Sequence, residues 1–204
     1  NAENSRNSDN GDIDVLAIRL PYSQEKETGV APSQYLGIDA GAIEIIIGEV
    51  KSGKRPIRFN NSIRDRENMK RVLLRIGFSN DEAYVSEIAR ILVEEMKPKR
   101  INNPDSCIEK VVTNLCPIRI RPIIFHLGYP SPLDNQPWFV GHQEIMDDIW
   151  RRLRLKLQPN TCQRAYNYEL WGPVFIDIVK YFKDKDRTEP GRPDALVKEL
   201  MRNE

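Results

Sequence analysis

Two short apolar runs stand out in the first quarter of the chain. The segments 12–20 (DIDVLAIRL) and 42–51 (AIEIIIGEVK) are rich in β-branched residues and are bounded by polar or turn-forming residues. Such runs are typical of strands, and the near-continuous apolarity after Asp14 predicts a strand that is covered on both faces. The connection 21–41 is rich in Pro, Gly, Ser and Gln, which predicts a long loop.

A helical period replaces the strand pattern further along the chain. Apolar residues with the i, i+3, i+4, i+7 spacing predict a helix over residues 64–76, and they are Met69, Val72, Leu73 and Ile76. The sequence Ser79-Asn80-Asp81-Glu82 reads as a capping box that opens a second helix, and Pro98 ends this helix.

The second half of the chain predicts one more long strand and several helices. The run 118–127 (IRIRPIIFHL) has strand composition, and Pro122 within it favours an edge position or a bulge. The remaining predicted elements are a short strand at 138–140, helices at 142–157 and 173–182, and one short helix within 183–204.

Composition and charge narrow the function classes. The chain has 204 residues, 40% hydrophobic content and a net charge of +1, so no global electrostatic attraction to nucleic acid or membrane is expected. No apolar run approaches the roughly 20 residues that a spanning helix needs, so we expect no membrane partner. The sparse cysteines Cys107, Cys116 and Cys162 form no CxxC pair. They indicate reduced thiols and a cytoplasmic protein.

Charged residues at the ends of the first two strands suggest chemistry. Asp14 stands near the start of one strand, and Glu49 and Lys51 stand on one face at the end of the other. Charges on a buried strand are costly unless something pairs with them. Two carboxylates form a hard oxygen site suited to Mg²⁺ or Mn²⁺, and a lysine beside them suits a phosphate or an attacking water.

These two strands resemble the motifs of the PD-(D/E)XK nuclease superfamily, and are most similar to those of Holliday-junction resolvases and Mrr-type restriction nucleases. The matching pieces are GDIDVLAI, with Asp14, and IIIGEVKSGK, with Glu49, Val50 and Lys51. The resemblance implies a metal-dependent nuclease that hydrolyses phosphodiester bonds, in DNA rather than RNA, for restriction, repair or defence against foreign DNA. It further implies that Asp14, Glu49 and the Val50 carbonyl hold the metal and that Lys51 serves the water or the phosphate.

The resemblance also implies a fold and a domain organisation. It predicts a restriction-endonuclease-like αβββαβ core with a mixed central sheet flanked by helices over residues 1–127. Residues 128–204 would form a helical extension packed on the same domain. The family has a helix and a strand before the Asp strand, whereas only eleven residues precede Asp12. Either an upstream segment lies outside this sequence or the site is incomplete. A homodimer would suit cleavage of both strands of a duplex.

Three basic residues after the motif are candidates for contacts with phosphates: Lys54, Arg55 and Arg58. A solvated basic loop is the equally simple interpretation. The Glu-x-Lys pattern recurs at Glu95-Met96-Lys97, where helical periodicity makes it a solvated helix end. The alternative function is a catalytically inactive module on the same fold that binds nucleic acid or a protein partner.

Overall fold

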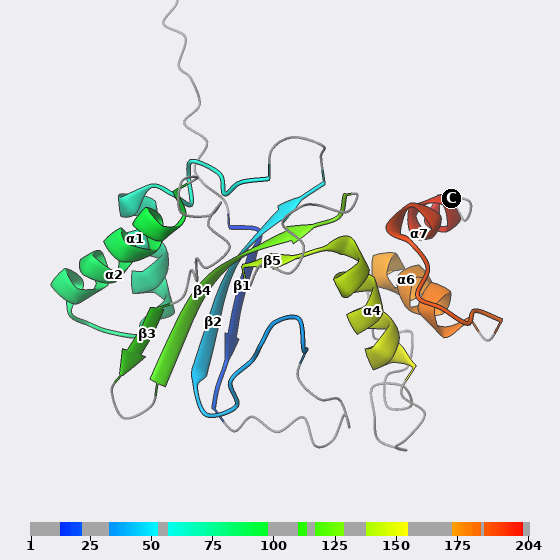
Figure 1. The fold of residues 1–204 in the computed structure, drawn as a ribbon, viewed down its shortest axis with the longest axis horizontal. Helices are drawn as coiled ribbons and strands as arrows, with labels where there is room; N and C mark the ends of the chain where they lie inside the picture. Colours follow the sequence, from blue (N-terminus) through cyan, green and yellow to red (C-terminus); the bar gives the residue numbers. More distant parts are fainter. Residues whose placement is uncertain are drawn as a thin grey trace, which may run out of the picture.

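The computed structural model describes residues 13–21, 33–52, 57–97, 110–113, 117–128, 138–154, 173–184 and 186–201. The strands are β1 (Val15–Arg19), β2 (Ile43–Lys51), β3 (Lys110–Thr113), β4 (Pro117–His126) and β5 (Phe139–Val140). The helices are α1 (Arg66–Ile76), α2 (Glu82–Glu95), α4 (His142–Leu153), α6 (Pro173–Lys183) and α7 (Pro193–Leu200). The fold is α/β, with a mixed sheet between two groups of helices (Figure 1).

The sheet joins segments that lie far apart in the sequence. β1 pairs antiparallel with β2, and β2 pairs parallel with β4. β3 and β5 pair with the other side of β4, antiparallel and parallel respectively. The parallel pairing of β2 and β4 requires a crossover, and α1 and α2 lie within this connection. β3 is the described strand that the sequence did not predict, because four residues carry too little pattern.

The prediction that the first strand is covered on both faces is wrong. β1 pairs with β2 and is, among the strands that the structure describes, the last one on its side of the sheet. Leu16 and Ile18 are 46% and 51% exposed. Continuous apolarity therefore marks an edge strand here, because the helices that cover the sheet lie over β2 and β4 instead.

The prediction that Pro122 lies on an edge strand or a bulge is also wrong. β4 is a central strand with neighbours on both sides. Ile124 donates its N–H to Trp138 O, and Pro122, two residues earlier, directs its backbone nitrogen to the same side of the strand. On that side β3 begins with Lys110 opposite Ile120, and β5 begins with Phe139 opposite Ile124. The N–H that proline lacks therefore falls in the gap between two short partner strands, where no ladder bond is broken.

Capping residues set the limits of α1 and α2. Asp65 caps α1 by accepting the N–H of Asn68, and Gly77 ends it with φ 71°, a left-handed conformation that favours glycine. Asp81 caps α2 by accepting from Ala83 and Tyr84. The capping box read from Ser79 therefore lies two residues too early, because the Asp81 carboxylate caps the helix.

The main core lies between the sheet and the pair α1–α2. Ile45 and Ile47 of β2 and Ile120 of β4 are almost completely buried against Leu73 of α1 and Leu92 of α2. Successive side chains of a strand point to opposite faces, so Glu49 and Lys51 lie on the same face as Ile45 and Ile47. The sheet face that carries the core also carries the candidate site at its end.

The opposite face of the sheet contains a buried ion cluster that the sequence analysis missed. Glu44 is 1% exposed and binds Arg119 at 2.5 Å and Arg121 at 2.9 Å. The N–H of Asp39 donates to the same carboxylate at 2.7 Å, and Arg119 also donates to Gly37 O at 3.0 Å. Glu44 thereby joins β2, β4 and the loop before β2, and its partners offset the cost of burying charge.

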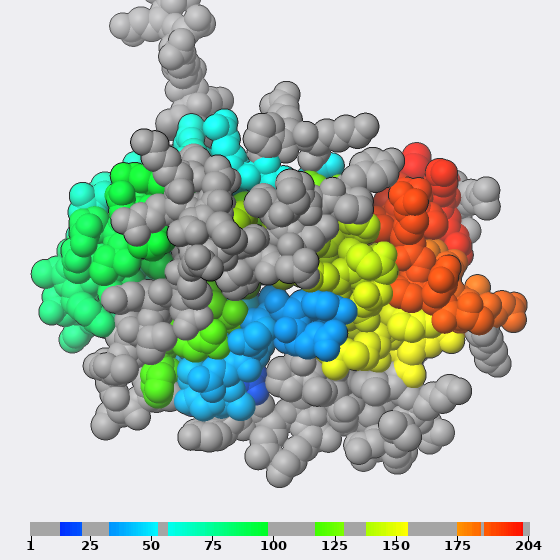
Figure 2. Space-filling view, viewed as in Figure 1, coloured from blue at the N-terminus to red at the C-terminus, as the bar shows by residue number. Residues whose placement is uncertain are grey.

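The C-terminal helices pack on the sheet through α4. Ile145 of α4 joins the apolar cluster on the second face, whereas Met146 of α4 packs with Tyr181 and Phe182 of α6. The predicted boundary between residues 1–127 and 128–204 stays a prediction. Figure 2 shows α1 and α2 (teal to green) on one flank of the molecule and α7 (red) on the other.

Basic residues at the end of α4 have partners within the protein. Arg151 and Arg152 bind Asp148 at 2.8 and 2.6 Å. Arg154 stacks on Trp150 and donates to the carbonyl oxygens of Phe182, Asp184 and Arg187. Arg154 thereby connects α4 to the end of α6 and to the segment after it.

Candidate functional site

The antiparallel β1–β2 pair brings Asp14 and Glu49 to neighbouring positions. Val15 pairs with Gly48, so the preceding Asp14 lies opposite the following Glu49, at the end of the pair. Residues opposite each other in an antiparallel pair project to the same face. The Asp14 carboxylate also accepts the backbone N–H of Val50 at 2.7 Å, which holds it against the end of β2.

Glu49 lies deep in the site although it is charged. It is 4% exposed, and its Cα partner on β4 is the fully buried Ile124. Lys51 Nζ binds one carboxylate oxygen, and the N–H of Asn60 donates to the other at 2.7 Å. Both oxygens therefore have partners that offset desolvation, as a buried carboxylate requires.

Lys51 bridges β2 and the turn before α1. Its ammonium group binds Glu49 and also donates to Asn60 Oδ1 at 2.6 Å. The Lys51 side chain keeps 24% of its surface exposed, against 5% for Glu49. A cation therefore lies on the Glu49 carboxylate at the boundary between core and solvent, where it can meet an anionic molecule.

Asn60 is a site residue that the sequence analysis missed. Its backbone N–H holds Glu49 and its side chain holds Lys51, so one residue sets the position of both charged groups. Phe59, which is fully buried next to Trp138, anchors the turn that carries Asn60. No spacing rule pointed to it, because the contact depends on how the chain returns to the sheet after β2.

The other predicted site residues lie apart from this group or outside the described residues. Lys54 and Arg55 fall outside the described residues. Arg58 is described and exposed. The Val50 side chain is 40% exposed and alternates to the opposite face from Glu49, so only its backbone can serve the site.

The residues present fit a divalent cation of the magnesium type. Mg²⁺ is commonly held by one or two carboxylates, with waters and substrate phosphates completing its shell. Asp14 and Glu49 supply two carboxylates on neighbouring strands, and Lys51 already occupies the position of a cation on Glu49. Within the described ranges, no group of three or more His, Cys, Asp and Glu side chains could hold a metal ion.

Comparisons with protein-family models, with curated proteins and with solved structures found no match to this chain. In the described part of the chain, none of the helices combines the length and apolarity needed to cross a membrane. Function is therefore argued from the site itself.

Proposed function

We propose that the protein is a metal-dependent nuclease of the PD-(D/E)XK type that hydrolyses the phosphodiester backbone of DNA in the cytoplasm. The observation that carries the proposal is the convergence of Asp14, Glu49 and Lys51 at one end of the β1–β2 pair. Two carboxylates and a lysine are the groups that metal-assisted phosphodiester hydrolysis needs.

The connectivity around the site supports the same proposal. An antiparallel strand pair carries the charged residues, α1 and α2 follow, and β4 then returns parallel to β2. Apart from the second helix, α2, and the strand β3, which also lie in this connection, the order is that of the ββαβ part of the αβββαβ core that the resemblance implies. The complete restriction-endonuclease-like core belongs to the proposal.

Each residue has a stated role in the proposed reaction. Asp14 and Glu49, with the Val50 carbonyl, would hold Mg²⁺ or Mn²⁺, which when bound supplies an activated water and charge stabilisation. Lys51 would neutralise the phosphate or orient the attacking water. Asn60 holds Glu49 and Lys51 in register. In this structure the Lys51 ammonium group binds both Glu49 and Asn60.

A cleavage assay tests the proposal. The protein is incubated with supercoiled plasmid, linear duplex, single-stranded DNA and RNA, in Mg²⁺, Mn²⁺ or EDTA. We expect metal-dependent cleavage of DNA that falls at least about 100-fold in Asp14→Asn and in Lys51→Ala, because each removes a charge that stabilises the transition state. Lys97→Ala is the matched control, since it changes the second Glu-x-Lys pattern, whose lysine binds Glu94 on the surface. Cleavage that persists in Asp14→Asn would sink the proposal.

One observation favours a second function, a catalytically inactive module that binds nucleic acid or a protein. Both oxygens of Glu49 already have partners within the chain. In that case calorimetry would detect no Mg²⁺ binding, and Glu49→Gln would leave partner binding intact. Mg²⁺ binding that depends on Glu49 would exclude this alternative.

A further inference from the structure

Basic residues gather on the solvent side of α1, the helix that follows the Asn60 turn. Met69 and Leu73 face the core. Outside the core the helix carries the exposed side chains of Arg66, Arg71 and Arg75 and the half-buried Lys70, against the single carboxylate of Glu67. We name these four the α1 basic face: Arg66, Lys70, Arg71 and Arg75. Arg58 and Arg64 precede the helix in the sequence, and Arg64 donates to Asn61 Oδ1.

Most of this charge is uncompensated. Lys70 binds Glu82 at 3.1 Å, whereas the side chains of Arg66, Arg71 and Arg75 have no ion pair or hydrogen bond with any residue in the described ranges. A solvated surface arginine costs little, but several on one helix repel each other. Their concentration therefore marks a surface suited to a polyanion.

Several exposed basic residues on the other helices are paired with acidic neighbours. On α2, Arg90 binds Glu87 at 2.7 Å. On α6, Lys180 binds Asp177 at 3.3 Å, and Arg192, just before α7, binds Asp194 at 3.2 Å. The net charge of +1 thus hides a local excess on α1.

We propose that the α1 basic face binds the phosphate backbone of the nucleic acid that enters the Asp14–Glu49–Lys51 site. This inference rests on the proposed function and adds to it the path of the substrate. α1 follows the segment in which Asn60 holds Glu49 and Lys51. In this proposal a strand bound at the site continues along the helix. An α1 of 11 residues is about 16 Å long. That length spans about five phosphates of one strand of a duplex.

Arginine suits this role because its planar guanidinium group binds phosphate oxygens through two parallel hydrogen bonds. Contacts with phosphates give affinity and position without reading bases. The α1 basic face therefore orients a strand for cleavage at the site and confers no sequence preference of its own. Its contribution is expected to weaken steeply as salt rises.

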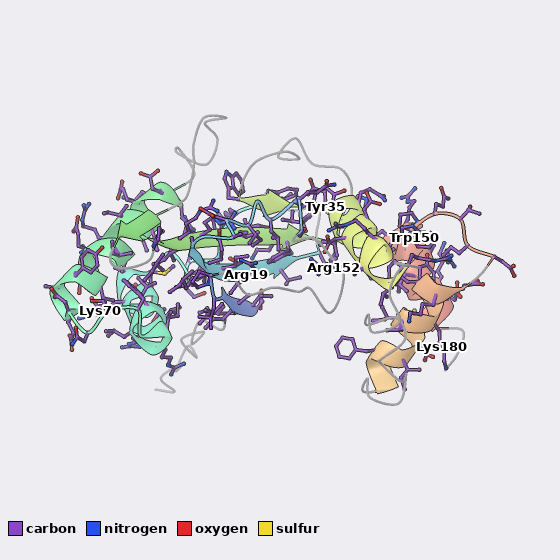
Figure 3. All side chains as sticks on the ribbon, turned by 90° about the horizontal axis from the view of Figure 1, so that it is seen from below. Arg19, Tyr35, Lys70, Trp150, Arg152 and Lys180 are labelled. Atoms are coloured by element: carbon purple, nitrogen blue, oxygen red, sulfur yellow. The ribbon has the colours of Figure 1, made fainter. Side chains whose placement is uncertain are left out.

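The test measures binding separately from cleavage. Fluorescence anisotropy follows a labelled duplex in EDTA between about 50 and about 200 mM salt, a range over which such contacts weaken strongly. The variant Arg66→Gln/Arg71→Gln/Arg75→Gln removes three charges, and glutamine keeps the helix propensity. The matched control is Lys180→Gln/Arg192→Gln/Lys198→Gln, which removes three exposed charges on α6, before α7 and on α7. Figure 3 shows Lys70 of α1 and Lys180 of α6 at opposite ends of the molecule.

We expect the slope of log affinity against log salt to fall by about 1 for each arginine that no longer binds a phosphate, hence by about 3 in the α1 variant and hardly at all in the control. Equal slopes for the two triple variants, or no binding of nucleic acid by the unaltered protein, would overturn the inference. An unaltered thermal midpoint excludes misfolding of the α1 variant. A labelled RNA of the same length identifies the polymer: a weaker effect on RNA than on DNA assigns the surface to DNA.

The two proposals fail in different ways. Binding that depends on α1, with no metal-dependent cleavage, would remove the nuclease proposal and leave the phosphate surface. Metal-dependent cleavage with full binding by the α1 variant would remove the surface and leave the nuclease.

Discussion

Gly48 shows how one residue without a side chain sets the geometry of the candidate site. It pairs with Val15 on β1. Glu49 follows Gly48 in the sequence and Asp14 precedes Val15, so both carboxylate residues lie directly beyond this pair. A Cβ built on Gly48 would lie 2.8 Å from Val15 Cβ and 2.7 Å from the Phe125 ring. Close packing at this point leaves no room for a methyl group between Val15 and the Phe125 ring.

Gly48→Ala is expected to destabilise the protein by about 1–3 kcal/mol, because the added methyl group overpacks the β1–β2–β4 junction. The free energy of unfolding in urea measures this change. Gly41→Ala is the control, since its Cβ would have no contact closer than 3.5 Å, and we expect a change within about 0.5 kcal/mol. Equal destabilisation in the two variants would mean that the close approach at Gly48 is not what stabilises this junction.

Asn60 illustrates the limit of sequence-based prediction at the scale of residues. Asp14, Glu49 and Lys51 were found because strand alternation and the position of strand ends are local properties. Asn60 could not be found in this way, because its two hydrogen bonds depend on the return of the chain toward β2. Glu44 was missed for a related reason: its partners Arg119 and Arg121 come from a strand far along the sequence.

At the scale of elements, α4 connects the sheet to the C-terminal helices and carries a charge pair at its end. Asp148 accepts hydrogen bonds from Arg151 and Arg152 on the next turn. Burial alone would raise the pKa of Asp148, but the two arginines outweigh it and the pKa is lowered below its ordinary value of 3.8. The ionised form is therefore favoured in the folded protein.

Because the pKa of Asp148 is lowered in the folded state, the stabilisation by its pairing with the two arginines depends on pH. It is complete above the unfolded value of 3.8 and is lost as pH falls through the folded value. We expect Asp148→Asn to lower the free energy of unfolding near neutral pH by less than about 1 kcal/mol, because the arginines are partly exposed. In strong acid the substitution should change the free energy of unfolding little. Asp147→Asn is the control on the same helix, because Asp147 accepts from Gln143 instead of an arginine. A difference between Asp148→Asn and the unaltered protein that stays constant with pH would contradict this account.

At the scale of the whole molecule, the candidate site lies at the edge of the main core, and its hydrogen bonds among the described residues involve none of the C-terminal helices. Its charged groups come from β1, β2 and the turn before α1. Metal binding to such a site links β1 to β2 and should stabilise the folded protein as a unit.

Mg²⁺ is therefore expected to raise the thermal midpoint of the unaltered protein. At a Mg²⁺ concentration of 100 times the dissociation constant, the free energy of unfolding should rise by about 2.7 kcal/mol. Asp14→Asn should abolish the rise while keeping an oxygen that accepts the Val50 N–H. KCl at matched ionic strength controls for screening. Identical shifts in the two proteins would show that the metal binds elsewhere.

The sequence by itself determined the types and approximate limits of most elements, and it pointed to the three charged residues of the candidate site. These follow from the periods of 2 and 3.6 residues, from caps such as Asp65 and Gly77, and from charges at strand ends. All are properties of residues close together in the chain.

The tertiary structure decided which strand lies at the edge, how Pro122 fits a central strand, and how Asn60 joins Glu49 to Lys51. These depend on pairings across long stretches of chain, between β2 and β4 above all. A local pattern predicts that a strand or a charge will be buried. Which residues bury it depends on the packing of the whole sheet, where many contacts between distant parts of the chain form together.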